Sequence, residues 1–458
     1  MAYDPKIIAF LCTWCSYTGA DTAGIARLKS PANIRAVRVP CSGRVAPEII
    51  MRTFDQGADG VLVLGCHIGE CHYDSGNHRT AKRLPILRSL MAFAGLEPER
   101  LRLDWVSASE GERFSRIVNE FADTVRALGP VNWRVERGER RVEKASVLDS
   151  PPHPANQMPC FAGQTSLITH SIRVKADELL SSGQASCVIG YEAGTHGRTR
   201  PAFIHDRDGV GRLVWNQDCT HNLTTYLRSA VNPLAHKKGE FARPVAIVVK
   251  PCDSRAINVL MAENRFKREQ VYLIGVACDG MRESQYNNGD TAVLQERCQQ
   301  CSERLPAVYD FLIGEPPQVQ IEPITMPRIA KLEAMQPEAR MEYWLSQFDR
   351  CIRCYACRQA CPMCDCPTCL YERDDSLWVS LRIELNEKRT FHLGRAFHLA
   401  GRCVDCHVCE IACPMEIPIS LLNGKLIQEM QSIFAHRAGL KPTPSPMVTI
   451  LNGEERLV

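Results

Sequence analysis

The sequence contains no long hydrophobic run. Its longest apolar stretches, such as "GVLVLGC" and "RPVAIVVKPC", are far shorter than the roughly 18 residues that a membrane-spanning helix needs. The N-terminal segment "MAYDPKIIAFLCTWC" has an early acidic residue, a proline and a short apolar run that ends in cysteines, so it does not resemble a secretory signal peptide. These absences predict a cytoplasmic protein without membrane insertion.

An excess of charge is also lacking. The 55 lysines and arginines against 52 aspartates and glutamates leave a net charge of +3 over 458 residues. A nucleic-acid-binding domain would show a broad basic excess, so nucleic acid is not a predicted partner.

The usual motifs of hydrolysis and group transfer do not occur. There is no G-x-S-x-G, no P-loop and no H-E-x-x-H, so no catalytic residue is predicted. No clear G-x-G-x-x-G follows a predicted strand, which leaves a Rossmann-type nucleotide site without support.

Cysteine, by contrast, is abundant. The chain has 23 cysteines, seven of them in "CIRCYACRQACPMCDCPTC" between Cys351 and Cys369. An odd number cannot all form disulfides, and a reducing cytoplasm disfavours them. The clusters therefore predict metal binding or redox chemistry.

Residues 1–130 alternate between strand and helix patterns. Apolar, β-branched runs at 6–12, 34–41, 60–66 and 101–108 predict strands, and helical patterns at 47–57, 78–95 and 110–129 lie between and after them. This alternation predicts a doubly wound parallel sheet, in which ligands bind beyond the carboxyl ends of the strands. Three of the four predicted strands end in a cysteine.

The rest of the chain divides into four further parts, and the whole is predicted to be of the α/β class. Residues 131–159 are polar and rich in proline, and predict an exposed linker. Residues 160–327 predict a second α/β domain. Residues 328–435 predict an α-helical module with two [4Fe-4S] clusters. Residues 436–458 predict a loosely held tail.

Two cysteine runs in the helical region carry the strongest signal. Each has the form C-x2-C-x2-C-x3-C-P, in which three thiolates hold one four-iron cluster and the fourth reaches across to the other. The spacing predicts two [4Fe-4S] clusters, one held by Cys351, Cys354, Cys357 and Cys413, and the other by Cys403, Cys406, Cys409 and Cys361. Zinc sites and redox dithiols, the alternatives, do not require this doubled pattern.

The segment between the two runs is largely helical in pattern. The module therefore resembles the α-helical ferredoxin type found in subunits of heterodisulfide reductase and succinate dehydrogenase. Three further cysteines could line the module, hold a separate metal or serve as alternative ligands, and the sequence does not choose among these roles: Cys364, Cys366 and Cys369.

Five N-terminal cysteines are expected at one rim of the predicted sheet: Cys12, Cys15, Cys41, Cys66 and Cys71. Their motifs, "LCTWCSYTGADTAG", "VPCSGRV" and "LGCHIGECHYDSGN", resemble the delta subunit of methyl-viologen-reducing hydrogenase over about residues 5–130. That family connects a hydrogenase or formate dehydrogenase to heterodisulfide reductase. The resemblance implies one [2Fe-2S] cluster held by four of the five thiols, with the fifth nearby.

Two other interpretations of this N-terminal site stay open. Thiolates also suit zinc, and His67 and His72 could imitate a Rieske arrangement. Because five thiols already exceed the ligands required, we expect the histidines to donate hydrogen bonds or to lie at the surface.

The middle region contains a third group of cysteines, which predicts a third [4Fe-4S] cluster: Cys252, Cys278, Cys298 and Cys301. Together with "VIGYEAGTHGRTRPAFI" and "VWNQDCTHNLTTYL", they resemble the beta subunit of deazaflavin-reducing hydrogenases and related formate dehydrogenases over about residues 160–315. The resemblance implies bound flavin, here FAD. Three isolated cysteines remain, of which Cys187 is predicted to be a buried small hydrophobe; the others are Cys160 and Cys219.

Together these features predict an iron–sulfur electron-transfer subunit of a larger complex. It would relay electrons between a donor hydrogenase or formate dehydrogenase catalytic subunit and a heterodisulfide-reductase-A-like flavoprotein of the type associated with electron bifurcation. The alternatives are a stand-alone flavin and iron–sulfur oxidoreductase, which uses a reduced nicotinamide or deazaflavin and ferredoxin, and a binding module with structural zinc.

Overall fold

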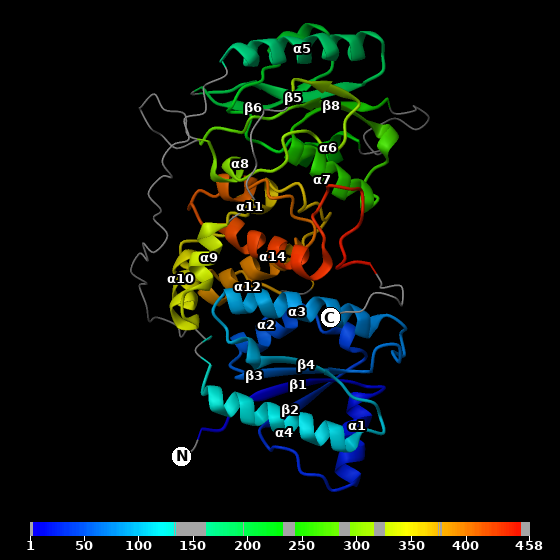
Figure 1. Cartoon of the computed structure of the whole chain (residues 1–458), viewed down its shortest axis with the longest axis vertical. Coiled ribbons are helices and arrows are strands. Elements are labelled where there is room, and N and C mark those ends of the chain that lie inside the picture. The colour runs from blue at the N-terminus through cyan, green and yellow to red at the C-terminus, as the bar shows by residue number, and fades with distance from the viewer. Residues whose placement is uncertain are drawn as a thin grey trace.

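The computed structural model describes residues 3–131, 133, 162–195, 197–231, 243–283, 294–315, 326–373, 375 and 378–449. Figure 1 shows an elongated molecule with a sheet domain at each end and a helical region between them. The N-terminal residues form the lower sheet domain, the middle of the chain forms the upper one, and the C-terminal region forms the helical layer that separates them. The prediction of an α/β chain with parallel sheets is confirmed.

The N-terminal sheet has four parallel strands in the order β2-β1-β3-β4: β1(Ile7–Cys12), β2(Ile34–Val39), β3(Gly60–Gly65) and β4(Leu101–Trp105). Strand β3 is buried along its whole length, which explains its unbroken apolar run.

Helices cover both faces of this sheet. One face packs against α1(Ser16–Ile25) and α4(Gly111–Leu128), and the other against α2(Pro47–Asp55) and α3(Gly76–Phe93). Alternate residues of β3 serve the two cores, Leu62 and Leu64 on one side and Val61 and Val63 on the other.

The upper sheet has the order β6-β5-β7-β8-β9: β5(Cys187–Ala193), β6(Thr199–Ile204), β7(Val245–Val249), β8(Val271–Val276) and β9(Phe311–Ile313). Only the pairing of β5 with β6 is antiparallel among these strands. Helix α5(Ala162–Ser181) lies over one face, and α6(Thr224–Ala230) and α7(Pro251–Ala262) lie on the face toward the helical layer (Figure 1).

The helical layer contains α9(Pro327–Glu333), α10(Pro337–Asp349), α11(Ala356–Gln359), α12(Leu385–His398), α13(Val408–Ile411) and α14(Ile419–Phe434). The helical pattern predicted over 326–347 is divided into two helices, because Pro337 begins a new helix at its first position. The very short α11 and α13 lie within the two cysteine runs.

The N-terminal sheet domain and the helical layer share one hydrophobic core. Phe54 and Leu87 of the sheet domain belong to the same cluster as Trp344, Leu393 and Leu422 of the helical layer. The two parts are therefore packed together as one body, which their different sequence patterns did not indicate.

A buried polar contact reinforces this junction. Asp55 on α2 accepts hydrogen bonds from Arg389, from Thr390 Oγ1 at 2.8 Å and from Trp133 Nε1 at 3.2 Å. The side chains of Asp55 and Arg389 are 5% and 2% exposed, so the ion pair is buried and fully engaged with partners.

Two predictions about connecting segments are wrong in the described residues. Trp133 lies in the predicted exposed linker but is only 1% exposed, because the Arg389 guanidinium stacks 4.1 Å from its ring centre. The predicted loose tail packs tightly over residues 436–449, where Ala438, Ser445 and Met447 are buried. Residues 134–159 of the linker and 450–458 of the tail lie outside the described residues.

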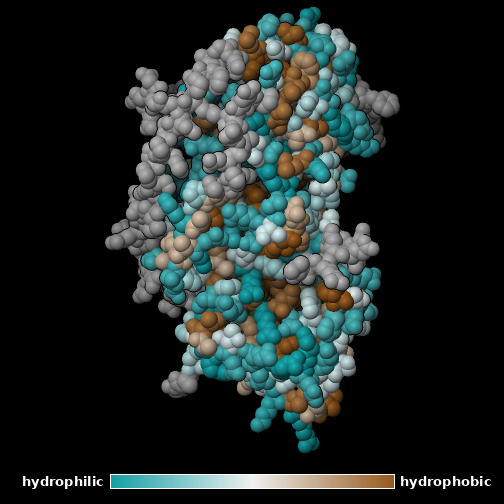
Figure 2. Space-filling view, in the orientation of Figure 1, coloured by the Kyte–Doolittle hydropathy of each residue, from teal (hydrophilic) through white to brown (hydrophobic). Residues whose placement is uncertain are grey.

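None of the described helices combines the length and apolar character required to cross a membrane. On the face drawn in Figure 2, hydrophobic residues stand in separate groups among hydrophilic ones.

Candidate metal centres

The five N-terminal cysteines gather at the carboxyl edge of the sheet, as the order of strands predicts. Cys12 ends β1, Cys41 and Cys66 follow β2 and β3, and Cys15 occupies the position before the first turn of α1. All five thiols, Cys71 included, are buried.

Their sulfur atoms form two adjacent groups. Cys12 Sγ and Cys66 Sγ are 3.8 Å apart, and Cys15 Sγ lies within 4.8 Å of both. Cys41 Sγ and Cys71 Sγ are 3.7 Å apart. Two thiolates at about 2.3 Å from one tetrahedral metal lie about 3.8 Å apart. Two such pairs side by side suit a two-metal centre better than a single zinc, which would take four thiolates at equal distances.

Backbone without side chains makes room for these sulfurs. A Cβ built at Gly76 would overlap Cys41 Sγ and lie 3.2 Å from Cys71 Sγ. Gly43 faces the backbone of Gly76 across the same space, and its amide donates to Cys41 Sγ at 3.4 Å. Such amide donors are typical of sulfur atoms that bind iron.

The thiols influence one another strongly. Hydrogen bonds from Cys12 and Cys15 lower the pKa of Cys66 to about 4, and the same contacts raise the pKa of Cys15. Several adjacent thiolates repel one another in a buried site. A bound metal would supply the positive charge that allows all of its thiol ligands to ionise.

The two neighbouring histidines face away from this role. His67 Nε2 lies 2.7 Å from Glu110 Oε2, and His72 stacks on Trp14 with 3.8 Å between ring centres. Trp14 and Tyr73 are half exposed, so an aromatic patch lies on the loops that carry the thiols.

The structure brings the first C-terminal set together across the two cysteine runs. The electrostatic neighbours of Cys351 include Cys354 and Cys413, and those of Cys357 include Cys351 and Cys413. Cys351, Cys357 and Cys413 also pack in one hydrophobic cluster. The fourth thiol of the second run thus lies beside the first three of the first run.

The second set is built in the reciprocal way. The electrostatic neighbours of Cys403 include Cys406 and Cys409, and Cys361 packs in the same core as Cys403 and Cys406. Cys409 lies between the sets, since its neighbours include both Cys406 and Cys357.

Both runs wind through the same backbone conformation. Arg353 and Tyr355 in the first run and Asp405 and His407 in the second all have positive φ, between 48° and 59°. This left-handed conformation costs a non-glycine residue about 1–3 kcal/mol, and it recurs at functional sites. Each loop is therefore preformed to aim its thiols inward.

These C-terminal thiols are too widely spaced for zinc. Among the described residues, Cys12, Cys15 and Cys66 are the only three thiols whose sulfurs all lie within 4.8 Å of one another. A tetrahedral zinc needs its thiolates about 3.8 Å apart. The C-terminal sets instead leave space for a larger cluster between the sulfurs.

The middle cysteines are only partly grouped as predicted. Cys278 has Cys298 and Cys301 among its electrostatic neighbours, and Met281 N donates to Cys298 Sγ at 3.3 Å. Cys252, at the start of α7, has Cys406 of the helical layer among its electrostatic neighbours. The middle group therefore borders the second C-terminal set.

Sequence reasoning missed two buried arginines among these thiols. Arg297 has four cysteines among its electrostatic neighbours, and so does Arg395. Thiolate neighbours raise the pKa of both guanidinium groups despite burial. The sequence signal was an arginine directly before Cys298, in "RCQQC", and a basic residue on the helix between the two runs.

The leftover cysteines differ in their surroundings. Cys364 is close to Cys361, and a hydrogen bond between their thiols together with burial raises its pKa. Cys369 is half buried, and Cys366 is exposed. Among the isolated cysteines, Cys187 and Cys219 are buried, and burial raises the pKa of each to about 11. Cys160 lies outside the described residues.

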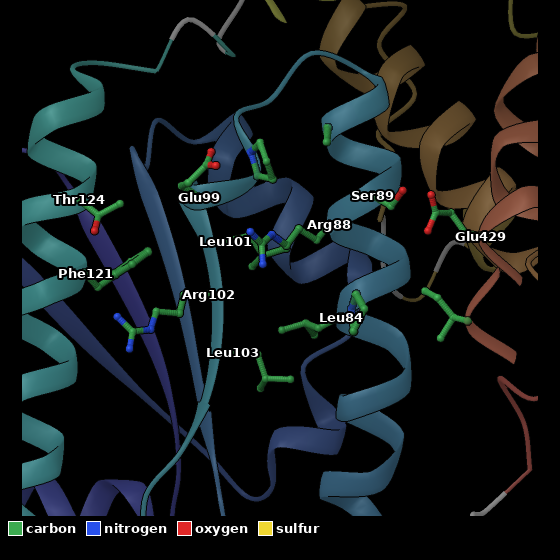
Figure 3. Close-up of a pocket in the computed structure, with 14 residues that line it drawn as sticks. Leu84, Arg88, Ser89, Glu99, Leu101, Arg102, Leu103, Phe121, Thr124 and Glu429 are labelled. Carbon is green, nitrogen blue, oxygen red and sulfur yellow. The ribbon is translucent and has the colours of Figure 1, made fainter. Parts of the chain in front are cut away.

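The described pockets do not coincide with the thiols. A groove of about 770 Å³ follows β4 between α3 and α4 and reaches α14; Figure 3 shows Leu84, Leu103 and Phe121 among its lining residues. Beside the middle cysteines, the described pockets hold only about 30 Å³ each, far too little for a flavin ring. Flavin therefore stays a prediction from resemblance.

Two protein families match parts of the chain. Residues 7–129 match the family described as methyl-viologen-reducing hydrogenase, delta subunit. Residues 350–418 match the family described as 4Fe-4S dicluster domain, which includes all eight cysteines of the two C-terminal runs.

Individual relatives match the N-terminal domain. The chain is 45% identical over 137 residues to the vhc iron-sulfur subunit of F420-non-reducing hydrogenase of Methanococcus voltae, covering 30% of this chain and 95% of the relative. It is 48% identical over 131 residues to the iron-sulfur subunit of F420-non-reducing hydrogenase of Archaeoglobus profundus, covering 29% of this chain and 96% of that one.

A third relative carries a similar domain within a longer chain. Over 127 residues the identity is 50% to the HdrA-type polypeptide of the ferredoxin/F420H2-dependent CoB-CoM heterodisulfide reductase of Methanosarcina acetivorans. The match covers 28% of this chain but only 16% of that protein.

Proposed function

Because the chain belongs, through residues 7–129, to the methyl-viologen-reducing hydrogenase delta-subunit family, we propose that it is an iron–sulfur electron-transfer subunit of an oxidoreductase complex. The observation that carries the proposal is the crossed arrangement of the two C-terminal cysteine runs. Their matching left-handed residues and reciprocal fourth thiols suit two four-iron clusters side by side.

We propose the ligands as the sequence spacing predicts them. Cys351, Cys354, Cys357 and Cys413 would hold one [4Fe-4S] cluster, and Cys403, Cys406, Cys409 and Cys361 the other. At the N-terminal site, the two close pairs support a [2Fe-2S] cluster in which Cys12 and Cys66 bind one iron and Cys41 and Cys71 the second. Cys15 would then be the neighbouring fifth thiol.

The middle region would complete the chain of centres. Cys278, Cys298 and Cys301 support a third [4Fe-4S] cluster, with Cys252 as the fourth ligand. This region resembles the beta subunit of deazaflavin-reducing hydrogenases and formate dehydrogenases, so we propose that it receives electrons from such a donor enzyme. The iron would carry the electrons, while the protein provides ligands, burial and hydrogen bonds.

The N-terminal domain would deliver electrons to a heterodisulfide-reductase-A-like flavoprotein. A similar domain forms part of the heterodisulfide reductase polypeptide of Methanosarcina acetivorans, which supports a close functional association between the two modules. The aromatic patch of Trp14, His72 and Tyr73 directly over the thiols is the surface we propose for this contact. Aromatic residues are common anchors of protein interfaces.

The test is electron transfer between purified proteins. The chain, purified without oxygen and reduced with dithionite, is mixed with a heterodisulfide-reductase-A-like flavoprotein while the flavin absorbance is followed. We expect flavin reduction, slowed at least tenfold by Trp14→Ala and unaffected by Ile25→Ala, which is exposed on the far end of α1. A chain that lacks iron, or that leaves the flavin oxidised, would refute the proposal.

A further inference from the structure

Arg297 lies at the boundary between the middle cysteines and the second C-terminal set. It directly precedes Cys298 on α8(Glu296–Gln299), and its side chain is buried. Its Nη1 donates to the carbonyl oxygen of Cys406, and its Nε donates to Gln295 Oε1 at 2.6 Å. One guanidinium thus connects a residue of the middle group with a residue of the helical layer.

Arg395 holds the equivalent place between the two C-terminal sets. It lies on α12, the helix between the two cysteine runs, and is 3% exposed. Its Nη2 donates to the carbonyl oxygen of Cys357 at 3.0 Å. Its Nε and Nη1 are buried and have no hydrogen-bond partner among the described residues.

The unpartnered N–H groups of Arg395 require an acceptor. A buried donor without a partner costs about 1–3 kcal/mol, and more when it is charged. The surroundings of this guanidinium are sulfur atoms, since its electrostatic neighbours are Cys357, Cys361, Cys364 and Cys409. The sulfur atoms of clusters on either side would provide the missing acceptors, so the donor set fits the groups proposed for this site.

The arginines also establish an order for the thiol sets. Arg297 has Cys298, Cys252 and Cys278 on one side and Cys406 on the other. Arg395 has Cys409 and Cys361 on one side and Cys357 on the other. The Cys403 set is therefore the central one, with a buried positive charge at each boundary.

A fixed positive charge favours the state of a neighbouring cluster that carries one more electron. The effect is large where water is excluded, and hydrogen bonds to sulfur act in the same direction. Arginine keeps its proton under all ordinary conditions, so the charge does not change when an electron arrives.

We propose that Arg297 and Arg395 are positioning residues that raise the reduction potential of the central cluster, held by the Cys403 set, above the potentials of its two neighbours. An electron entering from the middle site converts one ferric iron of the central cluster to ferrous iron, and no proton transfer accompanies it. The same electron then passes to the Cys351 set, which restores the ferric iron. This inference rests on the iron–sulfur function proposed above.

The experiment is a potentiometric titration of the full chain under anaerobic conditions, followed by paramagnetic resonance. We expect Arg297→Met and Arg395→Met each to shift the reduction equilibrium of the central cluster at least tenfold, a fall of about 59 mV for one electron. Arg297→Met should also lower the middle cluster, and Arg395→Met the Cys351-set cluster. A Cys406→Ser variant identifies the signal of the central cluster.

The control is Arg389→Met, on the same helix as Arg395. Arg389 is equally buried, but it pairs with Asp55 rather than facing thiols, so its loss should leave all three potentials unchanged. The variants Arg297→Lys and Arg395→Lys keep the charge and should show smaller shifts than the methionine variants.

Unchanged potentials in iron-replete methionine variants would overturn the inference. Loss of iron in the lysine and methionine variants alike would also overturn it, because the arginines would then be needed for assembly and not for potential. A wild-type chain without paramagnetic clusters would instead refute the proposed function itself.

Discussion

At Gly76, the fold leaves no space for a single methyl group. This residue begins α3 and faces the sulfurs of Cys41 and Cys71, so the thiol site depends on a hydrogen atom at that position. The interior position Gly24 in α1 is different, since a Cβ there would meet nothing within 4 Å.

We therefore expect Gly76→Ala to displace Cys41 and abolish the N-terminal cluster signal while the C-terminal signals remain. Gly24→Ala serves as the matched control and should raise the free energy of unfolding by roughly 0.5–1 kcal/mol through helix propensity. Iron content and low-temperature paramagnetic resonance measure both variants. A normal N-terminal signal in Gly76→Ala would contradict the crowding described here.

The proposed pairing of N-terminal thiols can be tested one cysteine at a time. We expect Cys66→Ser to lose the two-iron signal, because Cys66 forms one of the two close sulfur pairs. Cys15→Ser should retain it, with only a shifted spectrum. The reverse pattern would show that Cys15 is a ligand and that the pairing is wrong.

At the level of secondary structure elements, α2 and α12 join the sheet domain to the helical layer. Their contact combines apolar packing with the buried pair of Asp55 and Arg389. Breaking a buried pair by removing one partner costs about 3–5 kcal/mol, since the other charge stays buried.

We expect Asp55→Ala to lower the free energy of unfolding by about that amount, measured by chemical denaturation under anaerobic conditions. The exposed pair of Arg116 and Glu120 provides the control, and Glu120→Ala should cost under about 1 kcal/mol. Equal effects in the two variants would show that the α2–α12 junction carries little stability.

The same interface has a built-in dependence on pH. Glu48 on α2 is buried, which raises its pKa, but hydrogen bonds from His398 at 2.7 Å and from Tyr371 outweigh burial and lower it overall. A lowered pKa in the folded state stabilises the protein above the ordinary value of about 4.3. That contribution is lost as the pH falls through the folded-state pKa.

The wild-type chain should therefore lose stability as the pH is lowered from about 5 toward 3, and Glu48→Gln should lose less over the same range. Thermal unfolding at a series of pH values measures the difference. Parallel curves for the two proteins would contradict the role of Glu48.

Most elements followed from local patterns, and the exceptions have physical reasons. All four N-terminal strands lie where apolar runs predict them. Helix α1 escaped prediction because "SYTGADTAGI" has no apolar stripe and is held instead by its neighbours, as where Gly19 packs against Ser107. The buried position of Trp133 depends on Arg389, 256 residues away, which no local pattern can reveal.

The cysteine sites show the same division. Spacing was sufficient to group the C-terminal thiols crosswise, because the motif itself encodes the geometry. It was insufficient in the middle region, where Cys252 turned out to border Cys406. Contacts between domains decide that relation, and so do the places of Arg297 and Arg395.

For the whole molecule, the proposed centres add up to a definite composition. One two-iron and three four-iron clusters require about fourteen irons per chain. We expect anaerobic quantitation of iron and sulfide to approach that number and zinc to be negligible. About ten irons would remove the middle cluster, and stoichiometric zinc without iron would refute the assignment of every site.

The packing of the helical layer against the N-terminal sheet bears on how such a relay would operate. Carriers that swing on flexible tethers slow down when the solvent becomes viscous, because a segment must diffuse before each transfer. Here the two C-terminal sets and the sheet domain share one close-packed interior, so the separations between those stations are fixed in advance. Transfer within the chain would then proceed at the same pace in buffer and in concentrated glycerol, and only the encounter with outside partners would be slowed.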